Sequence, residues 1–275
     1  MGNTPKPLFV AGADGNRIHL ADWGGDGAPL LLLHGMGANT HWWDSVVPLL
    51  ASDRRVLAMD LRGHGESDWL EPPRYSIEHY AEDVEAVRAA LGWGRFALAA
   101  HSLGARVALR YASKAPPQLA ALALLDFLAV ALPAHARYER RTKTRQPSYE
   151  SEAAAAARFK LQPPGTLLSR EALDALGRRC VRQAKDGRWS WKFDWRGFYF
   201  EYHPVFDEAA AVRVPTLLVR GEHSLTMPRA AFQGVLAALT DARGLVIPGA
   251  HHHVTLDAPR ETAEALAGFL ATVRP

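Results

Sequence analysis

The stretch FALAAHSLGAR, residues Phe96–Arg106, decides the fold of this chain. Its first four residues are apolar and typical of a buried strand, and helical spacing follows over residues 106–111. Ser102 lies between the two. A strand, a tight turn with serine at its apex and a helix form the arrangement known as a nucleophile elbow, in which a strained backbone pushes the hydroxyl out of the sheet.

The second neighbours of Ser102 are small, as this turn requires. The strand and helix backbones nearly touch there, so a bulky side chain on either side would collide. The usual pattern is G-x-S-x-G, and here Ala100 replaces the first glycine while Gly104 keeps the second. The pentapeptide alone also fits an ordinary strand–turn–helix with an incidental serine, because short motifs have a real false-positive rate.

Strands alternate with helices along the chain, which predicts an α/β fold whose mostly parallel sheet has helices on both faces. A hairpin is expected around Asp14-Gly15, which joins Leu8–Ala13 to Arg17–Trp23. Further strands are expected at Pro29–Leu33, Arg55–Asp60, Leu119–Leu125, Pro215–Val219 and Gly244–Ile247. Helices are expected near His41 and at Ile77–Leu91, Pro228–Leu239 and Pro259–Val273, with Ser76 as an N-cap and Gly92 as a terminator.

The loop His34-Gly35-Met36-Gly37 follows a predicted central strand. Its glycines leave backbone N–H groups uncovered, ready to meet a developing oxyanion, although a plain turn would look the same. His64, in the loop after Asp60, has no partner nearby in sequence and is interpreted as structural.

The composition changes over residues 131–205, which we expect to form an inserted helical lid. Residues 133–196 hold fifteen Lys and Arg against seven Asp and Glu, a net +8. Helices are expected at Ala153–Lys160 and Arg170–Lys185, separated by Pro163-Pro164-Gly165. A dense aromatic run follows, which should wall an apolar pocket: Trp189, Trp191, Phe193, Trp195, Phe198, Tyr199, Phe200, Tyr202 and Phe206. The remaining residues, 1–130 and 206–275, form the core.

Overall composition excludes several classes of protein. The chain has 275 residues, 48% of them hydrophobic and 22% charged, with a net charge of +3, which suits one soluble α/β domain with an insertion. A single cysteine, Cys180, excludes an internal disulfide. No signal peptide, membrane-length apolar run or basic stripe is visible, so we expect a cytoplasmic protein without nucleic-acid or membrane partners.

Three adjacent histidines, His251, His252 and His253, follow the last predicted strand. A metal site is disfavoured, because consecutive residues on an irregular loop rarely aim three imidazoles at one ion. A single base is the better interpretation, because a serine hydroxyl is a poor nucleophile until an imidazole removes its proton. We therefore expect neither a metal nor a cofactor.

Taken in order, the motifs HGMG, DLRGHGES, AHSLG, PTLLVRGE and PGAHHHVTLDAP resemble those of the α/β-hydrolase fold family. The resemblance covers nearly the whole chain outside the lid. It places the nucleophile at Ser102 and, from the spacing to Pro259, the base at His252. It also implies an oxyanion hole formed by the backbone amides of Met36 and Leu103. A serine nucleophile disfavours the family's haloalkane dehalogenases and epoxide hydrolases, which use aspartate.

The chain departs from the family's motifs at one point, the position of the acidic residue of the catalytic triad. The family often places it in a G-x-x-D turn, which here reads Gly221-Glu222-His223-Ser224 and ends in serine. Other members place it after the strand that follows the elbow helix, a position held here by Asp126. We favour Asp126, with Glu222 as the alternative, because triads are recognised by geometry and not by chain order.

The resemblance implies a serine hydrolase that acts on a carboxylic ester or lactone through an acyl-enzyme. Alternatives are hydrolysis of a carbon–carbon bond beside a ketone, or a ligand-binding receptor with a vestigial triad, since fold alone does not fix function. The expected partner is a small-molecule substrate, and we expect a monomer or homodimer. The charge of the lid suggests some preference for acidic substrates.

Overall fold

The computed structural model describes residues 4–50, 54–130, 146–198 and 203–273. The strands are β1 (Lys6–Ala11), β2 (Arg17–Gly24), β3 (Ala28–Leu33), β4 (Arg54–Met59), β5 (Phe96–His101), β6 (Leu119–Leu125), β7 (Val181–Gln183), β8 (Trp189–Trp191), β9 (Thr216–Gly221) and β10 (Ala242–Ile247). The α-helices are α1 (Ile77–Ala90), α2 (Leu103–Ser113), α4 (Glu152–Ala156), α5 (Arg170–Arg179), α6 (Phe206–Ala211), α7 (Arg229–Ala238), α8 (Val254–Asp257) and α9 (Pro259–Leu270). Short 3-10 helices are η1 (Thr40–Trp43), η2 (Val47–Leu49) and η4 (Trp195–Phe198).

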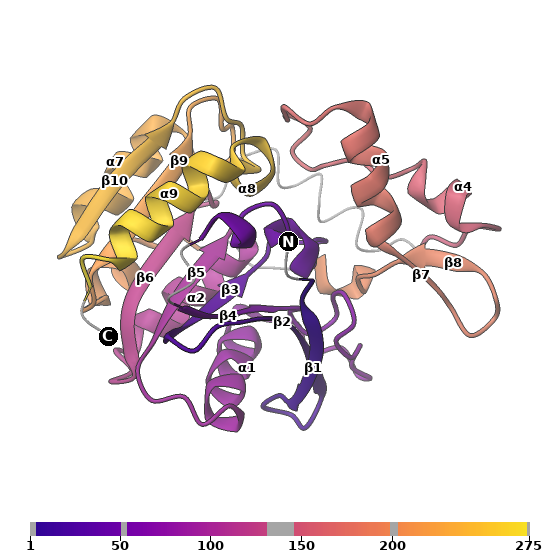
Figure 1. Ribbon diagram of the computed structural model, residues 1–275, viewed down its shortest axis with the longest axis horizontal. Coiled ribbons are helices and arrows are strands. Elements are labelled where there is room, and N and C mark those ends of the chain that lie inside the picture. The colour runs from indigo at the N-terminus through magenta and orange to yellow at the C-terminus, as the bar shows by residue number, and fades with distance from the viewer. Residues whose placement is uncertain (1–3, 51–53, 131–145, 199–202, 274–275) are drawn as a thin grey trace.

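The main sheet has eight strands in the order β1-β2-β4-β3-β5-β6-β9-β10 (Figure 1). The hairpin β1–β2 is antiparallel and joins β4 in antiparallel fashion, whereas all pairs from β4 to β10 are parallel. The predicted α/β fold with a mostly parallel sheet is confirmed. The elbow strand β5 lies between β3 and β6, so the ends of these three strands bring their following loops together.

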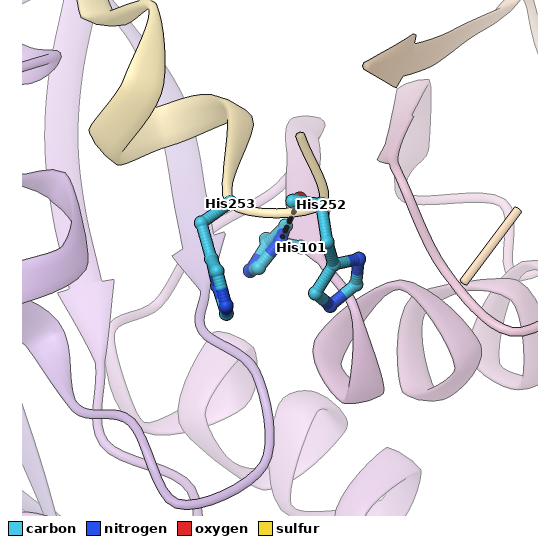
Figure 2. Close-up of side chains that lie close together, drawn as sticks. All are labelled: His101, His252 and His253. Carbon is cyan, nitrogen blue, oxygen red and sulfur yellow. Dashed lines mark hydrogen bonds between the residues drawn. The ribbon is translucent and has the colours of Figure 1, made fainter. Parts of the chain in front are cut away.

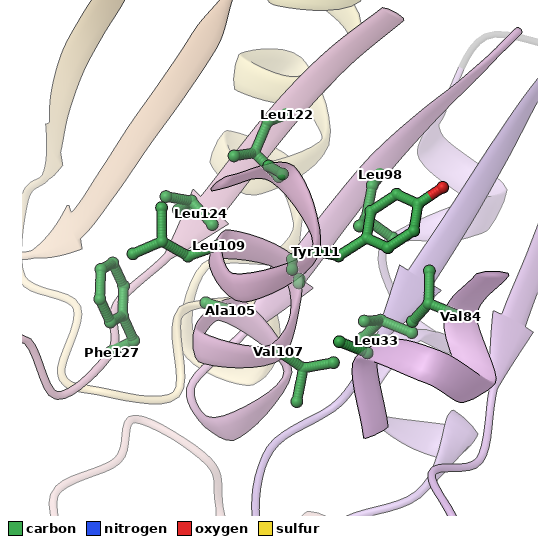
Figure 3. Packing of buried hydrophobic residues seen from close by; sticks show 14 of the residues in the cluster. Leu33, Val84, Leu98, Ala105, Val107, Leu109, Tyr111, Leu122, Leu124 and Phe127 are labelled. Carbon is green, nitrogen blue, oxygen red and sulfur yellow. The ribbon is translucent and has the colours of Figure 1, made fainter. Parts of the chain in front are cut away.

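The central strands are buried on both faces, which explains why they are continuous apolar runs. In β3, Leu31 and Leu33 pack into one core cluster with α1, α2 and α7, whereas Leu30 and Leu32 pack into a second cluster with α9. Figure 3 shows part of the first cluster, in which α2 carries Val107 on the side of Leu33 and Leu109 on the side of Leu124. The two clusters cover both faces of β5 in the middle of the sheet.

Several predicted elements differ from the observed ones. The helix expected near His41 is only the 3-10 turn η1, and the first insertion helix is shortened to α4. The second ends at Arg179 and not at Lys185, because a hairpin of β7 and β8 begins directly afterwards. Gly187 closes this hairpin with φ +80°, a conformation that glycine adopts without strain. The insertion is therefore not purely helical.

Figure 1 shows α4, α5, β7 and β8 extending from one side of the sheet. The predicted boundaries 131–205 include residues 131–145 and 199–202, which lie outside the described residues, as do Tyr199, Phe200 and Tyr202 of the aromatic run. That this insertion acts as a lid stays a prediction. Among the helices that the structure describes, none is long and apolar enough to cross a membrane.

A buried ion pair anchors the loop after β4. The Arg62 and Asp83 side chains are both fully buried, and two guanidinium N–H groups donate to the two carboxylate oxygens at 2.6 and 2.7 Å. Arg62 also donates to Asp14 Oδ2 at 2.6 Å, which ties in the first hairpin. Breaking a buried pair from one side leaves a charge without a partner, which costs far more than losing an exposed pair.

We expect Arg62→Met to lower the free energy of unfolding by about 3–5 kcal/mol, because it leaves the buried Asp83 carboxylate without its charged partner. A matched control is Arg170→Met, whose pair with Asp174 is 71% and 40% exposed. It should cost less than about 1 kcal/mol. Urea unfolding followed by circular dichroism measures both, and equal losses in the two variants would contradict this account of the buried pair.

Candidate active site

Ser102 lies at the apex of the turn between β5 and α2. The strand runs through His101 and the helix begins at Leu103, so the turn itself is a single residue. Ser102 has φ 55° and ψ −117°, a conformation that costs a non-glycine residue roughly 1–3 kcal/mol. The geometry of a nucleophile elbow, predicted from the pentapeptide, is present.

Close packing around Ser102 explains its small neighbours. A Cβ atom on Gly104 would lie 2.6 Å from the carbonyl oxygen of His34, and one on Gly35 would lie 2.9 Å from Ser102 Cβ. Both positions therefore exclude larger residues. Ala100, which replaces the first glycine of the usual pattern, is fully buried within the first core cluster, so its methyl group is accommodated.

A line of hydrogen bonds leads away from the serine. His252 Nε2 lies 3.0 Å from Ser102 Oγ, and His252 Nδ1 lies 2.8 Å from Asp126 Oδ1. His252 comes from the loop between β10 and α8, and Asp126 directly follows β6. The structure thus brings together the three residues predicted from the sequence, over separations of 150 and 126 residues.

Asp126 is fully buried, and its carboxylate has further donors. Ser224 Oγ donates to Oδ1 at 2.6 Å, and the Gly221 amide donates to Oδ2 at 2.8 Å. These donors stabilise a buried carboxylate that would otherwise be costly. Sequence reasoning missed this role of Ser224, although it holds the turn position where the family often has its acid.

Glu222, the alternative acid, lies elsewhere. Its side chain is exposed and its Oε2 accepts a hydrogen bond from the Gly249 amide at 2.8 Å. Glu222 therefore serves the turn before His252, whereas Asp126 holds the imidazole.

The two predicted oxyanion amides border the serine. Leu103 is the first residue of α2, so its N–H has no acceptor within the helix. Met36 follows Gly35, which lies against Ser102. Among the described residues, neither amide donates a hydrogen bond to a protein group. The Gly104 amide, in contrast, donates to the His34 carbonyl at 3.0 Å and holds the two loops together.

The insertion contacts the loops around the site. Asp257 Oδ1 accepts hydrogen bonds from Thr166 Oγ1 at 2.6 Å and from the Leu167 amide at 2.8 Å. Its Oδ2 accepts from the His251 amide at 2.9 Å, so one carboxylate joins the insertion to the loop that carries the catalytic candidate His252. Phe193 of the insertion packs near Gly37, in the loop that carries Met36.

In the described part of the chain, one group of three potential metal-ligating side chains lies close together: His101, His252 and His253. Figure 2 shows these three rings, with His101 Nε2 hydrogen-bonded to the His252 carbonyl oxygen at 2.9 Å. Cys180, the lone cysteine, is buried, and burial raises the pKa of its thiol to about 12, which makes it an inert side chain.

Known proteins resemble this one over nearly its whole length. A family model described as the alpha/beta hydrolase fold matches residues 28–259. Esterase Rv0045c of Mycobacterium tuberculosis is 30% identical, over 98% of this chain and 91% of that protein. The 2-(acetamidomethylene)succinate hydrolase of Mesorhizobium japonicum is 28% identical, over 90% and 89%.

Comparison with solved structures points to the same family as the sequence comparisons. A crystal structure of E-2-(acetamidomethylene)succinate hydrolase superposes with a TM-score of 0.84 at 25% identity and covers 98% of this chain and 100% of that one. A structure of the M. tuberculosis esterase, described together with its transition metal inhibition, gives a TM-score of 0.82 at 29% identity and covers 99% of this chain and 94% of that one. This chain belongs to the α/β-hydrolase fold family, and its relatives support a hydrolase.

Two buried histidines make stability depend on pH. Burial lowers the pKa of His64 and of His253 to about 3. Unfolded histidine titrates near pH 6.5, so below that value the unfolded chain binds more protons than the native one. The stability contributed by each neutral histidine is therefore complete above pH 6.5 and is lost as the pH falls below it.

We expect His253→Gln to reduce the loss of unfolding free energy between pH 7.5 and 5.5 by about 1.4 kcal/mol relative to wild type. Urea unfolding at the two pH values measures this difference. His251→Gln is the control, because His251 is only partly buried. The same pH dependence in wild type and His253→Gln would show that His253 is not held neutral by burial.

Proposed function

We propose that this protein is a serine hydrolase that cleaves a carboxylic ester or a lactone through an acyl-enzyme intermediate. The observation that carries the proposal is the hydrogen-bonded line from Ser102 through His252 to Asp126, at 3.0 and 2.8 Å. The esterase and hydrolase names of the relatives support the same reaction class.

In the first step, His252 Nε2 accepts the proton of Ser102 Oγ while that oxygen attacks the substrate carbonyl carbon. The oxygen of the tetrahedral intermediate faces the amides of Met36 and Leu103, which stabilise its negative charge. His252 then returns the proton to the leaving oxygen, and the acyl group stays on Ser102.

In the second step, a water molecule attacks the acyl-enzyme with His252 again as base, which releases the acid and restores Ser102. Asp126 holds the Nδ1–H of His252 and stabilises the imidazolium form in both steps. We therefore propose that Ser102, His252 and the two amides act on the substrate. Asp126 is the carboxylate of the triad and acts through His252.

The alternatives use the same scaffold. Hydrolysis of a carbon–carbon bond beside a ketone would employ the same triad and is retained as the second candidate. A receptor with a vestigial triad is disfavoured, because the Asp126 carboxylate, the His252 imidazole and the Ser102 hydroxyl lie at hydrogen-bonding distances. A cytoplasmic location, a small-molecule substrate and a monomeric or homodimeric state belong to the proposal as well.

Ion pairs reduce the attraction that three cations of the insertion offer to an acidic substrate. Lys192 pairs with Glu66, Arg196 with Glu71 and Asp194, and Arg179 with Asp44. These cations are neutralised by carboxylates, so they offer little attraction to an acidic substrate. We retain a weak preference for acidic substrates as part of the proposal.

Ser102→Ala should abolish turnover and leave the fold intact, because loss of a triad member costs ~10⁴–10⁶ in kcat. Purified wild type and variant would be tested against p-nitrophenyl esters, lactones and ring-cleavage dienoates, with circular dichroism as the control for folding. Equal hydrolysis by both proteins would rule out Ser102 as the nucleophile. No hydrolysis by either protein would favour the receptor.

Asp126→Asn should lower kcat by ~10²–10⁴, because asparagine favours the wrong tautomer of His252. Glu222→Gln is the matched control and should cost about tenfold or less. Steady-state kinetics on the best substrate of the panel gives both values. A larger loss of kcat in Glu222→Gln than in Asp126→Asn would identify Glu222 as the acidic residue of the triad.

A further inference from the structure

Three histidine rings meet behind the candidate nucleophile. His101 ends β5, whereas His252 and His253 lie on the loop before α8. All three are buried, at 1%, 2% and 4% exposure, and their ring centroids are 4.8, 4.9 and 5.9 Å apart. Figure 2 shows that they come from two segments that are far apart in the sequence.

Hydrogen bonds define the tautomers of two of these rings. His101 Nε2 lies 2.9 Å from the His252 carbonyl oxygen, and His253 Nε2 lies 3.1 Å from the Pro163 carbonyl oxygen. A carbonyl only accepts, so both Nε2 atoms must carry the proton, which leaves a lone pair on each Nδ1. Both Nδ1 atoms are buried and have no hydrogen-bond partner among the described residues.

Histidine binds a metal ion through the lone pair of a ring nitrogen that carries no proton, and the tautomers above leave one such nitrogen on His101 and one on His253. His252 is held through the other nitrogen, because its Nδ1 donates to the Asp126 carboxylate, and its Nε2 lies 3.0 Å from Ser102 Oγ. Each histidine thus has one nitrogen fixed by an oxygen acceptor, as histidine ligands of metals do.

We propose that His101, His252 and His253 form an inhibitory site for a divalent transition metal ion such as Zn²⁺. With one ring nitrogen taken from each residue, the three atoms lie within 4.8 Å of one another. Zinc binds imidazole nitrogen at about 2.0–2.1 Å, so the three nitrogens must move closer together to bind one ion. The inhibitory effect rests on the proposed function, whereas binding of the ion does not.

Inhibition follows from the shared base. When His252 donates a lone pair to the metal, that pair is no longer available to accept the proton of Ser102, and the serine stays an unactivated hydroxyl. The site does not consist of the three consecutive histidines: His251 is partly exposed and its ring faces His223 at 5.5 Å. The third imidazole of the proposed site comes from His101 and not from His251.

The test measures zinc binding in a protein that cannot turn over. Isothermal titration calorimetry with zinc chloride would use Ser102→Ala, and the same protein with His253→Gln or His251→Gln added. Glutamine keeps an N–H group that can donate to the Pro163 carbonyl, but it removes the Nδ1 lone pair. We expect His253→Gln to raise the Kd for zinc at least tenfold and His251→Gln to leave it unchanged.

Activity provides the second readout. Zinc chloride should inhibit ester hydrolysis by the chain with Ser102 intact, and His253→Gln should need at least tenfold more zinc for half inhibition, relative to its own metal-free rate. If His253→Gln does not fold, His253→Phe replaces it in both measurements. The site is wrong if zinc does not bind to Ser102→Ala, or if His251→Gln weakens binding as much as His253→Gln does. If no substrate is hydrolysed, the proposed function fails, but calorimetry still decides the site.

Discussion

The structure depends most on the 2.8 Å hydrogen bond between the Asp126 carboxylate and His252 Nδ1. It joins the end of β6 to the loop after β10, and it sets which nitrogen of His252 faces Ser102. A buried carboxylate is stable only with donors around it, and Ser224 and Gly221 supply them. The turn after β9 therefore supports Asp126, which directly follows the neighbouring strand β6.

The elbow is the second constraint, because it places the serine hydroxyl where this imidazole can reach it. The positive φ of Ser102 is maintained by a rigid strand buried on both faces and by the close approach of Gly35 and Gly104 to the neighbouring loops. The same packing leaves the Leu103 amide at the start of α2 without an acceptor in the helix. The candidate nucleophile and the N-terminus of α2 thus follow from one turn of the chain.

The sequence predicted much of this arrangement, because apolar strands and glycine turns are local patterns and because the resemblance to the family implied the roles of Ser102, Asp126 and His252. It did not predict the hairpin of β7 and β8, since the helical spacing that begins at Arg170 continues past the end of α5. The sequence also did not predict two other contacts between distant segments. The hydrogen bond from Ser224 to Asp126 spans 98 residues, and the histidine cluster joins His101 to residues 151 and 152 positions away. Only the folded sheet brings such groups together.

Covalent labelling tests the central claim, an activated Ser102, most directly. A fluorophosphonate probe transfers its phosphonyl group to an activated serine oxygen and releases fluoride, which intact-mass spectrometry and peptide mapping detect. The account predicts one adduct, located on Ser102 in the peptide that joins β5 to α2. An adduct on another residue, or an unlabelled protein that still hydrolyses esters, would contradict it.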